Sequence, residues 1–421
     1  MEVYSPEDLQ LFKKKAIKWA ASFETACCFD SNGYSDPYSA FDVLIAAGSV
    51  SEVIANTGKA FEELENYCSQ KDQYLLGFLS YDLKNETEDL SSLNPDHLEF
   101  PDLYFFQPAN LLRIRNNAVE IIFAESSDIL TQIENINLDE EKPCFIGEVQ
   151  NRFTPSEYQE SVYKLKEHIQ RGDVYEVTFC QEFYSEKCIL DPINAFYKLS
   201  KISPTPFSSF LKYNSKYIIS ASPERFLSKR GNKVISQPIK GTLKRSKDLL
   251  MDEKLKIQFQ NDPKELAENV MIVDLVRNDL TRCAVPGTVK VEELCGVYTF
   301  EHVHQMISTI TCTVDPKLSN PAIIKSTFPM GSMTGAPKFS SMQLIEKYER
   351  SKRGIFSGAI GYFAPNGDFD FNVVIRTILY NENKKYLSYH VGSAITFSSD
   401  PKDEYEECLL KAEAIRKTLA L

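Results

Sequence analysis

Four glutamates near the beginnings of two predicted helices are candidates for chemistry in this sequence. They are Glu265, Glu268, Glu404 and Glu407. Both helices start with Asp-Pro, an acceptor side chain followed by a proline at the first helical position. Each pair of glutamates is spaced three residues apart and therefore shares a helix face. The helix after Glu268 is nearly apolar all round, and a carboxylate entering a buried helix needs a partner.

A divalent cation is one such partner, because Mg²⁺ prefers oxygen ligands and is often held by one or two carboxylates together with substrate oxygens. Ordinary structural roles fit the same residues. Glu265 is placed for a capping box, and Glu407 with Lys411 has the spacing of an exposed i,i+4 ion pair. The spacing alone leaves both interpretations open.

A lysine and a glutamate beside predicted strands are candidates for nucleophile and acid. Lys240 lies in Pro-Ile-Lys-Gly-Thr (238–242), where proline and glycine fix the backbone after a strand. A buried lysine has a lowered pKa and can attack as a nucleophile. Glu224 lies in Ser-Pro-Glu-Arg-Phe (222–226) and is a candidate general acid. A lysine in a surface turn and a Glu–Arg surface pair are the alternative interpretations.

Three further features are suited to bind an anion. The glycine-rich segment 331–338 leads into a predicted helix, whose free N–H groups attract carboxylates or phosphates. Arg376 lies inside a predicted apolar strand, 373–379, where it needs an anionic partner. Gly392, at the end of the next predicted strand, can add backbone donors. An ordinary glycine-rich turn and a structural salt bridge are the competing explanations.

The elements that must position these residues follow no regular βαβ alternation. Period-2 runs predict strands at 174–183, 207–213, 217–222, 233–236, 358–363, 372–380 and 385–391. Helices are predicted over 6–22 and from Thr154, Asp262, Ala336 and Asp400. This interspersion favours an α+β fold with largely antiparallel sheets. The polar run 137–142 predicts a linker between a β-rich N-terminal part, 1–145, and a part that bears the candidate residues, 146–421.

Length, charge and cysteine use exclude several classes of protein. A chain of 421 residues can bury a large core. The net charge of −12 argues against a nucleic-acid partner, which needs a basic surface. The ten cysteines follow no disulfide or zinc pattern, and we recognise neither a signal peptide nor an apolar run of membrane-spanning length. We therefore expect a cytoplasmic protein with reduced thiols and no membrane contact.

Five motifs, in this order, resemble the chorismate-utilising enzymes, the family of anthranilate synthase, isochorismate synthase and aminodeoxychorismate synthase. The motifs are Ser-Pro-Glu-Arg-Phe, Pro-Ile-Lys-Gly-Thr, Ala-Glu-Asn-Val-Met-Ile-Val-Asp-Leu-Val-Arg-Asn-Asp, Ser-Met-Thr-Gly-Ala-Pro-Lys and Asp-Glu-Tyr-Glu-Glu. The similarity is dense from about Thr154 to Leu421 and weaker before it. It implies the family fold, in which two large, mainly antiparallel β-sheets pack as a sandwich with helices on the outside.

The resemblance also implies a reaction. Lys240 stands where anthranilate synthases usually carry alanine, and it is similar to the lysine of aminodeoxychorismate synthase component I, which attacks the chorismate ring. Glu224 would protonate the departing C4 hydroxyl while Lys240 attacks C2, and ammonia would then attack C4 and expel the lysine. The implied activity is amination of chorismate to 4-amino-4-deoxychorismate, a step of 4-aminobenzoate and folate biosynthesis.

A metal and a set of substrate contacts follow from the same resemblance. Glu268 and Glu407 would hold Mg²⁺ against the ring carboxylate, with Glu265 and Glu404 assisting through water. Substrate contacts and their support would come from Thr242, Thr334, Gly335, Tyr362, Arg376, Gly392 and Lys411.

Two departures from the family pattern bear on the product. Gln305 replaces a histidine that is tied to pyruvate elimination in anthranilate synthases, which agrees with a reaction that stops at the amino product. Glu176 stands where isochorismate synthases have a water-activating lysine, and we expect it to help deprotonate incoming ammonium. We find no glutaminase motif, so ammonia would come from a separate glutamine amidotransferase subunit or from solution. Anthranilate synthase component I and a catalytically silent protein of this fold are the alternatives.

Overall fold

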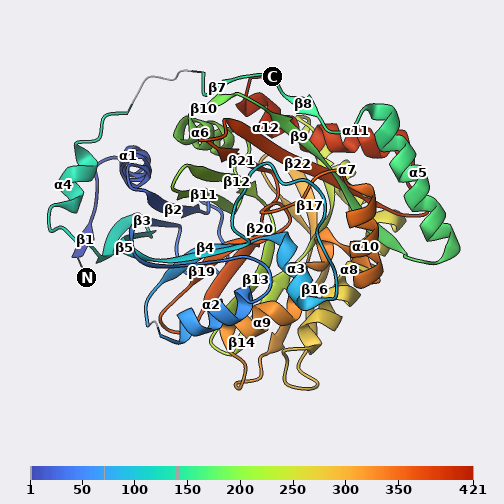
Figure 1. Cartoon of the computed structure of the whole chain (residues 1–421), viewed down its shortest axis with the longest axis horizontal. Coiled ribbons are helices and arrows are strands. Elements are labelled where there is room, and N and C mark those ends of the chain that lie inside the picture. The colour runs from blue at the N-terminus through green and yellow to red at the C-terminus, as the bar shows by residue number, and fades with distance from the viewer. Residues whose placement is uncertain (1, 71, 139–142, 421) are drawn as a thin grey trace.

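The computed structural model describes residues 2–70, 72–138 and 143–420 (Figure 1). Residues 139–142, most of the predicted linker, lie outside the described residues. The helices are α1 (Leu9–Ala21), α2 (Ala60–Ser69), α3 (Lys84–Thr87), α4 (Ile129–Glu134), α5 (Pro155–Arg171), α6 (Pro192–Ile202), α7 (Leu249–Gln260), α8 (Pro263–Thr281), α9 (Asn320–Thr327), α10 (Lys338–Tyr348), α11 (Pro401–Lys411) and α12 (Glu413–Thr418), with two 3₁₀ turns, η1 (Tyr81–Leu83) and η2 (Gly331–Met333).

Strands occur along most of the chain. They are β1 (Glu2–Tyr4), β2 (Thr25–Asp30), β3 (Val43–Ala55), β4 (Leu75–Leu79), β5 (Leu103–Arg115), β6 (Ala118–Phe123), β7 (Phe145–Ile146), β8 (Gln150–Asn151), β9 (Glu176–Ser185), β10 (Ile189–Leu190), β11 (Phe207–Tyr213), β12 (Lys216–Ser222), β13 (Arg225–Arg230), β14 (Lys233–Gln237), β15 (Ile239–Lys244), β16 (Lys290–Thr299), β17 (Val303–Thr313), β18 (Gly335–Ala336), β19 (Ala359–Phe363), β20 (Phe369–Val373), β21 (Thr377–Asn381) and β22 (Tyr386–Ile395).

Antiparallel pairing joins twenty of the described strands into one hydrogen-bonded network, and β7 with β10 forms a separate pair. The predicted α+β class and antiparallel character are confirmed. The two sheets expected from the resemblance are connected, because β9 pairs with β22, and β22 continues through β21, β12 and β11 to β2. Strands from both sides of the predicted boundary at residue 145 also pair directly, β2 with β11 and β4 with β19.

The buried apolar residues form two large clusters that use opposite faces of shared strands. Ile218 of β12 belongs to one cluster and its neighbour Ile219 to the other. Successive side chains of a strand point to opposite faces, so a strand buried on both faces reads as an unbroken apolar run. Helix α1 covers the second cluster with Phe12 and Trp19, and α2 and α9 cover the first.

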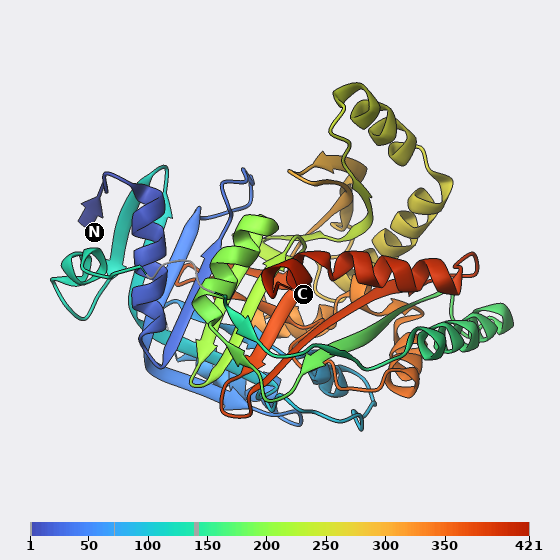
Figure 2. The ribbon, with the colours of Figure 1, turned by 90° about the horizontal axis from the view of Figure 1, so that it is seen from above.

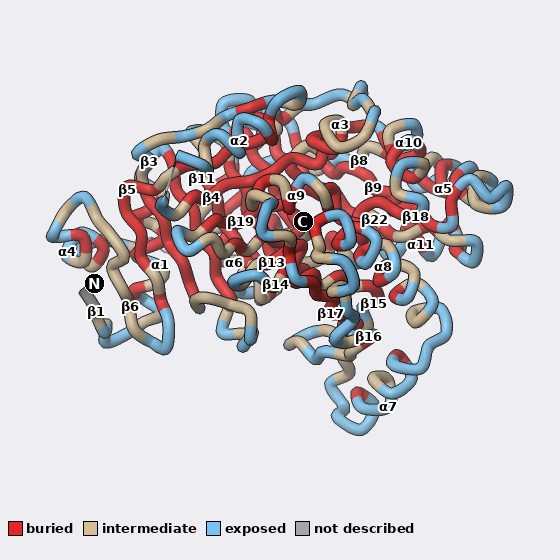
Figure 3. Tube along the Cα trace, turned by 90° about the horizontal axis from the view of Figure 1, so that it is seen from below, coloured by how far each residue is buried: buried red, intermediate tan, exposed pale blue. Residues whose placement is uncertain are grey.

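Local signals predicted the starts of α5, α8 and α11 correctly. Helix α5 begins with a capping box in which Thr154 and Glu157 each bond the other's backbone N–H. Asp262 caps α8 and Asp400 caps α11, each accepting from two backbone N–H groups. Helix α7 has no counterpart among the predicted helices, because its apolar residues do not gather on one face: Leu249 and Leu250 are 78% and 80% exposed. In Figure 2, α7 and β16 stand clear of the body of the molecule, and Figure 3 shows α7 as mostly exposed.

One predicted strand is wrong in a way that matters for the site. The run 372–380 was expected to be continuous, but β20 ends at Val373 and β21 begins at Thr377. Arg376 lies in the break with a φ of +52°, in the left-handed region. A non-glycine residue is strained there, and such strain is common at functional sites. Because Arg376 lies between the two strands, its side chain does not follow the alternation of faces that a continuous strand would impose.

Candidate active site

One cavity of about 1270 Å³ gathers most of the predicted site residues. Strands β9, β15 and β22, turn η2 and helices α8 and α11 contribute to its lining. Ten of the predicted residues line it: Glu224, Lys240, Thr242, Glu265, Glu268, Arg376, Gly392, Glu404, Glu407 and Lys411. They come from segments more than 150 residues apart in sequence, so the cavity is a product of the tertiary fold.

Lys240 is a buried strand residue, 8% exposed, and not a lysine in a surface turn. Its Nζ lies 2.5 Å from Oε1 of Glu176. Gly241 beside it has a φ of +86°, and a Cβ there would lie 2.3 Å from Oε2 of Glu265. The left-handed φ therefore favours glycine at this position.

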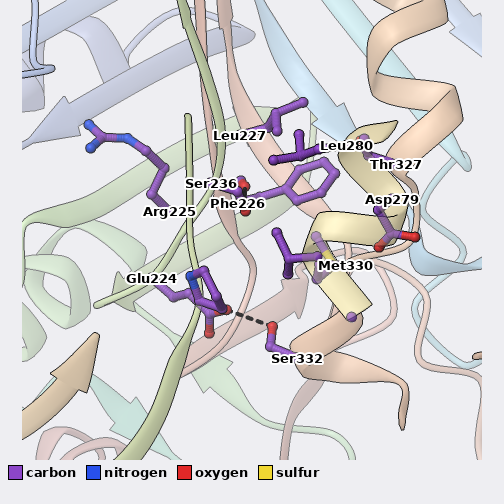
Figure 4. A pocket seen from close by; sticks show the side chains of 13 residues that line it. Glu224, Arg225, Phe226, Leu227, Ser236, Asp279, Leu280, Thr327, Met330 and Ser332 are labelled. Carbon is purple, nitrogen blue, oxygen red and sulfur yellow. Dashed lines mark hydrogen bonds between the residues drawn. The ribbon is translucent and has the colours of Figure 1, made fainter. Parts of the chain in front are cut away.

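Glu224 is buried at 4% exposure in the turn between β12 and β13. Burial raises its pKa to about 7, and a hydrogen bond from Ser332 Oγ to Oε1, 2.6 Å long, partly opposes that rise. The alternative of a Glu–Arg surface pair is wrong. Arg225 points away from Glu224 and binds Asp370, with 3.0 Å between Nε and Oδ1 (Figure 4).

A second, much smaller hollow of about 20 Å³ lies on another side of Glu224 (Figure 4). Ser332, Ser236 and Asp279 are among its polar lining residues, and Phe226 and Leu280 are among its apolar ones. This volume suits a single water molecule. Glu224 thus lies between a wide cavity and a hollow of water size.

The four glutamates on α8 and α11 face the same cavity but differ in surroundings. Burial raises the pKa of Glu268 to about 7 and also raises the pKa of Glu265. Glu404 is 4% exposed, and its Oε2 has no hydrogen-bond partner within the described residues. Glu407 is bound by Lys411, 2.6 Å away, whose Nζ also donates to the Gly392 carbonyl.

These carboxylates suit a hard cation, although the described residues contain no preassembled group of three or more metal-binding side chains. The unpartnered buried oxygen of Glu404 and the raised pKa values on α8 show carboxylates that lack a positive partner. Mg²⁺ commonly takes only one or two protein carboxylates and completes its shell with water and substrate oxygens. The residues present therefore fit Mg²⁺.

Arg376 is a cation that has no partner among the residues that the structure describes. Within the described part of the chain its side chain forms no hydrogen bond and no ion pair, so the structural salt bridge considered from sequence is not observed. Burial lowers the pKa of the guanidinium, and the Glu224 carboxylate partly opposes that effect. A guanidinium that lines a cavity unpaired is suited to bind an anionic group of a ligand.

Three of the predicted contact residues do not line this cavity. Thr334 is fully buried, and its hydroxyl bonds the Met330 and Gly331 carbonyls. Gly335 pairs with β9. Tyr362 packs in the core against Phe29, Phe41 and Tyr74.

Other residues near these positions do line the cavity. Ser332, two residues before Thr334, reaches both the cavity and Glu224. Phe356 lines it beside His390, with the rings stacked at 4.9 Å. Gln305 also lines it, and its Nε2 is 3.4 Å from Thr242 Oγ1. The Ser-Met-Thr-Gly motif signalled the right segment, but a motif does not show which of its side chains faces the cavity.

The comparisons agree with this architecture. The chain belongs to the chorismate binding enzyme family, whose model matches residues 24–417. Anthranilate synthase component 1 of Saccharolobus solfataricus is 33% identical over 347 residues, which cover 82% of this chain and 80% of that protein. Aminodeoxychorismate synthase component 1 of Bacillus subtilis is also 33% identical, covering 82% of this chain and 77% of that protein. The corresponding Escherichia coli protein is 30% identical over 92% of each chain.

Solved structures show the same fold. Anthranilate synthase component I from Streptococcus pneumoniae matches with a TM-score of 0.79 at 24% identity, over 92% of this chain and 93% of that chain. Within the described residues, no helix has the length and apolarity that a membrane span requires. Fold, family and site together define a chorismate-utilising enzyme.

Proposed function

We propose that this chorismate-utilising enzyme aminates chorismate at C4 to give 4-amino-4-deoxychorismate. The observation that carries the proposal is one cavity that holds the Lys240 amine, the Glu224 carboxyl group and the unpaired Arg376 guanidinium. The three groups match an amine nucleophile, an acid that is protonated near neutral pH and an anchor for a substrate carboxylate.

The reaction is two allylic displacements. In the first, the Lys240 nitrogen bonds to C2, the ring double bond shifts, and the C4 hydroxyl leaves as water with a proton from Glu224. In the second, ammonia bonds to C4, the double bond shifts back, and the C2–N bond to Lys240 breaks. The new C4 ammonium group then gives one proton back to the Glu224 carboxylate. The sum is chorismate plus ammonia giving 4-amino-4-deoxychorismate plus water. Splitting one hard substitution into two easier ones is the benefit of a covalent intermediate.

Mg²⁺ would be held by Glu268 and Glu407, with Glu265 and Glu404 assisting through water. When bound, it would supply positive charge that offsets repulsion between these four glutamates, called the acidic wall below, and a dianionic substrate. Lys411 keeps Glu407 in place through their 2.6 Å ion pair and is itself fixed on the Gly392 carbonyl.

Ammonia would come from a separate glutamine amidotransferase subunit. The names of the relatives support this, since the Bacillus subtilis and Escherichia coli proteins are each called component 1. The sequence contains no glutaminase motif of its own. Ammonium salts should therefore support turnover by the isolated chain if the ammonia site is open to solvent.

Anthranilate formation is the second candidate, because a relative of that name is equally similar at 33% identity. Two residues argue against anthranilate formation. By the resemblance, anthranilate synthases usually carry alanine at the position of Lys240. They also carry a histidine, tied to pyruvate elimination, at the position of Gln305, and a glutamine cannot transfer a proton.

Product analysis tests the proposal. The purified chain is incubated with chorismate, Mg²⁺ and ammonium at mildly alkaline pH, and products are separated with mass detection. We expect 4-amino-4-deoxychorismate, convertible to 4-aminobenzoate by an added lyase. Lys240→Ala should abolish it, whereas Lys290→Ala, at an exposed position on β16 outside the cavity lining, should leave the product unchanged. Anthranilate or isochorismate as the main product would contradict the proposal.

A further inference from the structure

Glu176 is buried behind the proposed nucleophile. It is fully buried and does not line the cavity, whereas Lys240 does. One carboxylate oxygen, Oε1, lies 2.5 Å from the Lys240 Nζ, and the other, Oε2, has no hydrogen-bond partner within the described residues. The backbone holds this side chain in place, because Ser341 Oγ donates to the Glu176 carbonyl at 3.0 Å and β9 pairs with β18 at this residue.

This placement changes the role expected from sequence. A reactant in the cavity meets Lys240 and not the buried Glu176. Direct deprotonation of incoming ammonium by Glu176 is therefore disfavoured by the geometry. Within the described residues, Glu176 is the only side chain that hydrogen-bonds to the Lys240 amine, so it is the group in contact with a proton that must move.

We propose that Glu176 is a catalytic base for Lys240, taking a proton from its ammonium group before attack and returning it when the lysine is expelled. This inference rests on the proposed covalent function. In the first step the N–H bond of the Lys240 ammonium breaks, the proton goes to Oε1, and the nitrogen lone pair becomes free to attack C2. In the second step the acid proton returns to the departing nitrogen. No other reactant is needed, and Glu176 ends as it began.

The charge state of the amine gives this proton transfer its importance. An ammonium group has no lone pair and cannot attack until it loses a proton, and Glu176 is placed to take that proton directly. A positioned general base contributes roughly 100-fold to 10,000-fold to such a step. A glutamine at this position has the same shape and can hydrogen-bond to the amine, but it cannot accept the proton.

The test is a single-turnover measurement without ammonia. Wild type and Glu176→Gln are mixed with chorismate and Mg²⁺, and the reaction is quenched in acid at a series of times. Mass spectrometry of the peptide that contains Lys240 then measures the fraction that carries an adduct of chorismate minus one water. We expect Glu176→Gln to form the adduct about 100-fold more slowly at neutral pH. Its rate should rise with pH as solvent base replaces the missing carboxylate, while the wild-type rate changes less. Glu176→Asp should recover part of the lost rate.

Controls separate this proposal from the one on which it rests. Gln181→Leu, another buried position on β9, should form the adduct at the wild-type rate. Unchanged chorismate affinity in Glu176→Gln, measured by equilibrium binding, shows that the cavity has kept its shape. Adduct formation by Glu176→Gln at the wild-type rate and with the wild-type pH dependence would overturn the role of Glu176. Absence of both adduct and amino product in wild type would instead overturn the proposed function.

Discussion

Glu224 is the side chain whose ionisation most directly controls the proposed reaction. Burial raises its pKa to about 7, and the hydrogen bond from Ser332 acts in the opposite direction. The protonated form is the one that can protonate a leaving hydroxyl. Activity that depends on Glu224 is therefore highest below its folded-state pKa and falls as the pH rises through about 7.

The Ser332→Ala substitution should raise this pKa further, because it removes a donor that stabilises the carboxylate. We expect the falling alkaline limb of the kcat/KM profile to move up by about one pH unit, the size expected for a lost hydrogen bond to a charged group. The measurement is the pH dependence of kcat/KM for chorismate, with the concentration of free ammonia kept saturating at every pH. Ser236→Ala is the control, because Ser236 lines the same small hollow but donates to the Phe226 carbonyl. A limb that stays in place or moves to lower pH would count against the role of Glu224.

Helices α8 and α11 act as a pair of scaffolds for the acidic wall. Each begins with a capping aspartate and a proline, and each carries its glutamates in the first two turns. The caps fix where the helices begin, so they also fix which turn faces the cavity. An identical local signal at two distant places in the sequence thus produces two facing rows of carboxylates.

Removal of a carboxylate from this wall should weaken the response to Mg²⁺. For enzyme stripped with a chelator and titrated with Mg²⁺, we expect Glu268→Gln to raise the half-saturating concentration by about 10-fold or more, since it loses a ligand. Asp274→Asn is the matched control on the same helix, because Asp274 is 76% exposed and paired with Arg277. Equal Mg²⁺ dependence in the two variants would argue against a metal at Glu268.

The whole molecule is held together by strands that cross the boundary predicted at residue 145. Strand β2 pairs with β11 over six residues from Thr25 to Asp30, and β4 pairs with β19. The cluster that buries Trp19 also contains Phe179, Tyr389 and Tyr405 from the C-terminal part. Both large apolar clusters draw residues from the two parts, so loss of one part exposes apolar surface of the other.

Cooperative unfolding should follow from this shared core. Trp19 is the single tryptophan and lies buried in α1, so its fluorescence reports on the N-terminal part. We expect its urea midpoint to coincide with the midpoint followed by far-ultraviolet circular dichroism, which reports on the whole chain. An early, separate fluorescence transition would mean that residues before the boundary unfold on their own.

The sequence by itself determined the elements that depend on local rules. Capping and proline placed the starts of α5, α8 and α11, period-2 alternation placed β11 and β12, and the motif order identified the family. These signals are readable because each arises from neighbouring residues. Helix α7 and the break at Arg376 were not readable, because the first lacks an apolar face and the second is a backbone conformation that surrounding structure imposes.

Only the tertiary structure decided which side chains meet. It brought together Lys240 and Glu176, which are 64 residues apart, and it left Arg376 without a partner among the described residues. It also turned Ser332 and Phe356 to the cavity while placing Thr334 and Tyr362 in the core. The reason is physical: spacing along a chain fixes which face of an element a residue occupies, but burial, pairing and the resulting pKa depend on what the other elements place against that face.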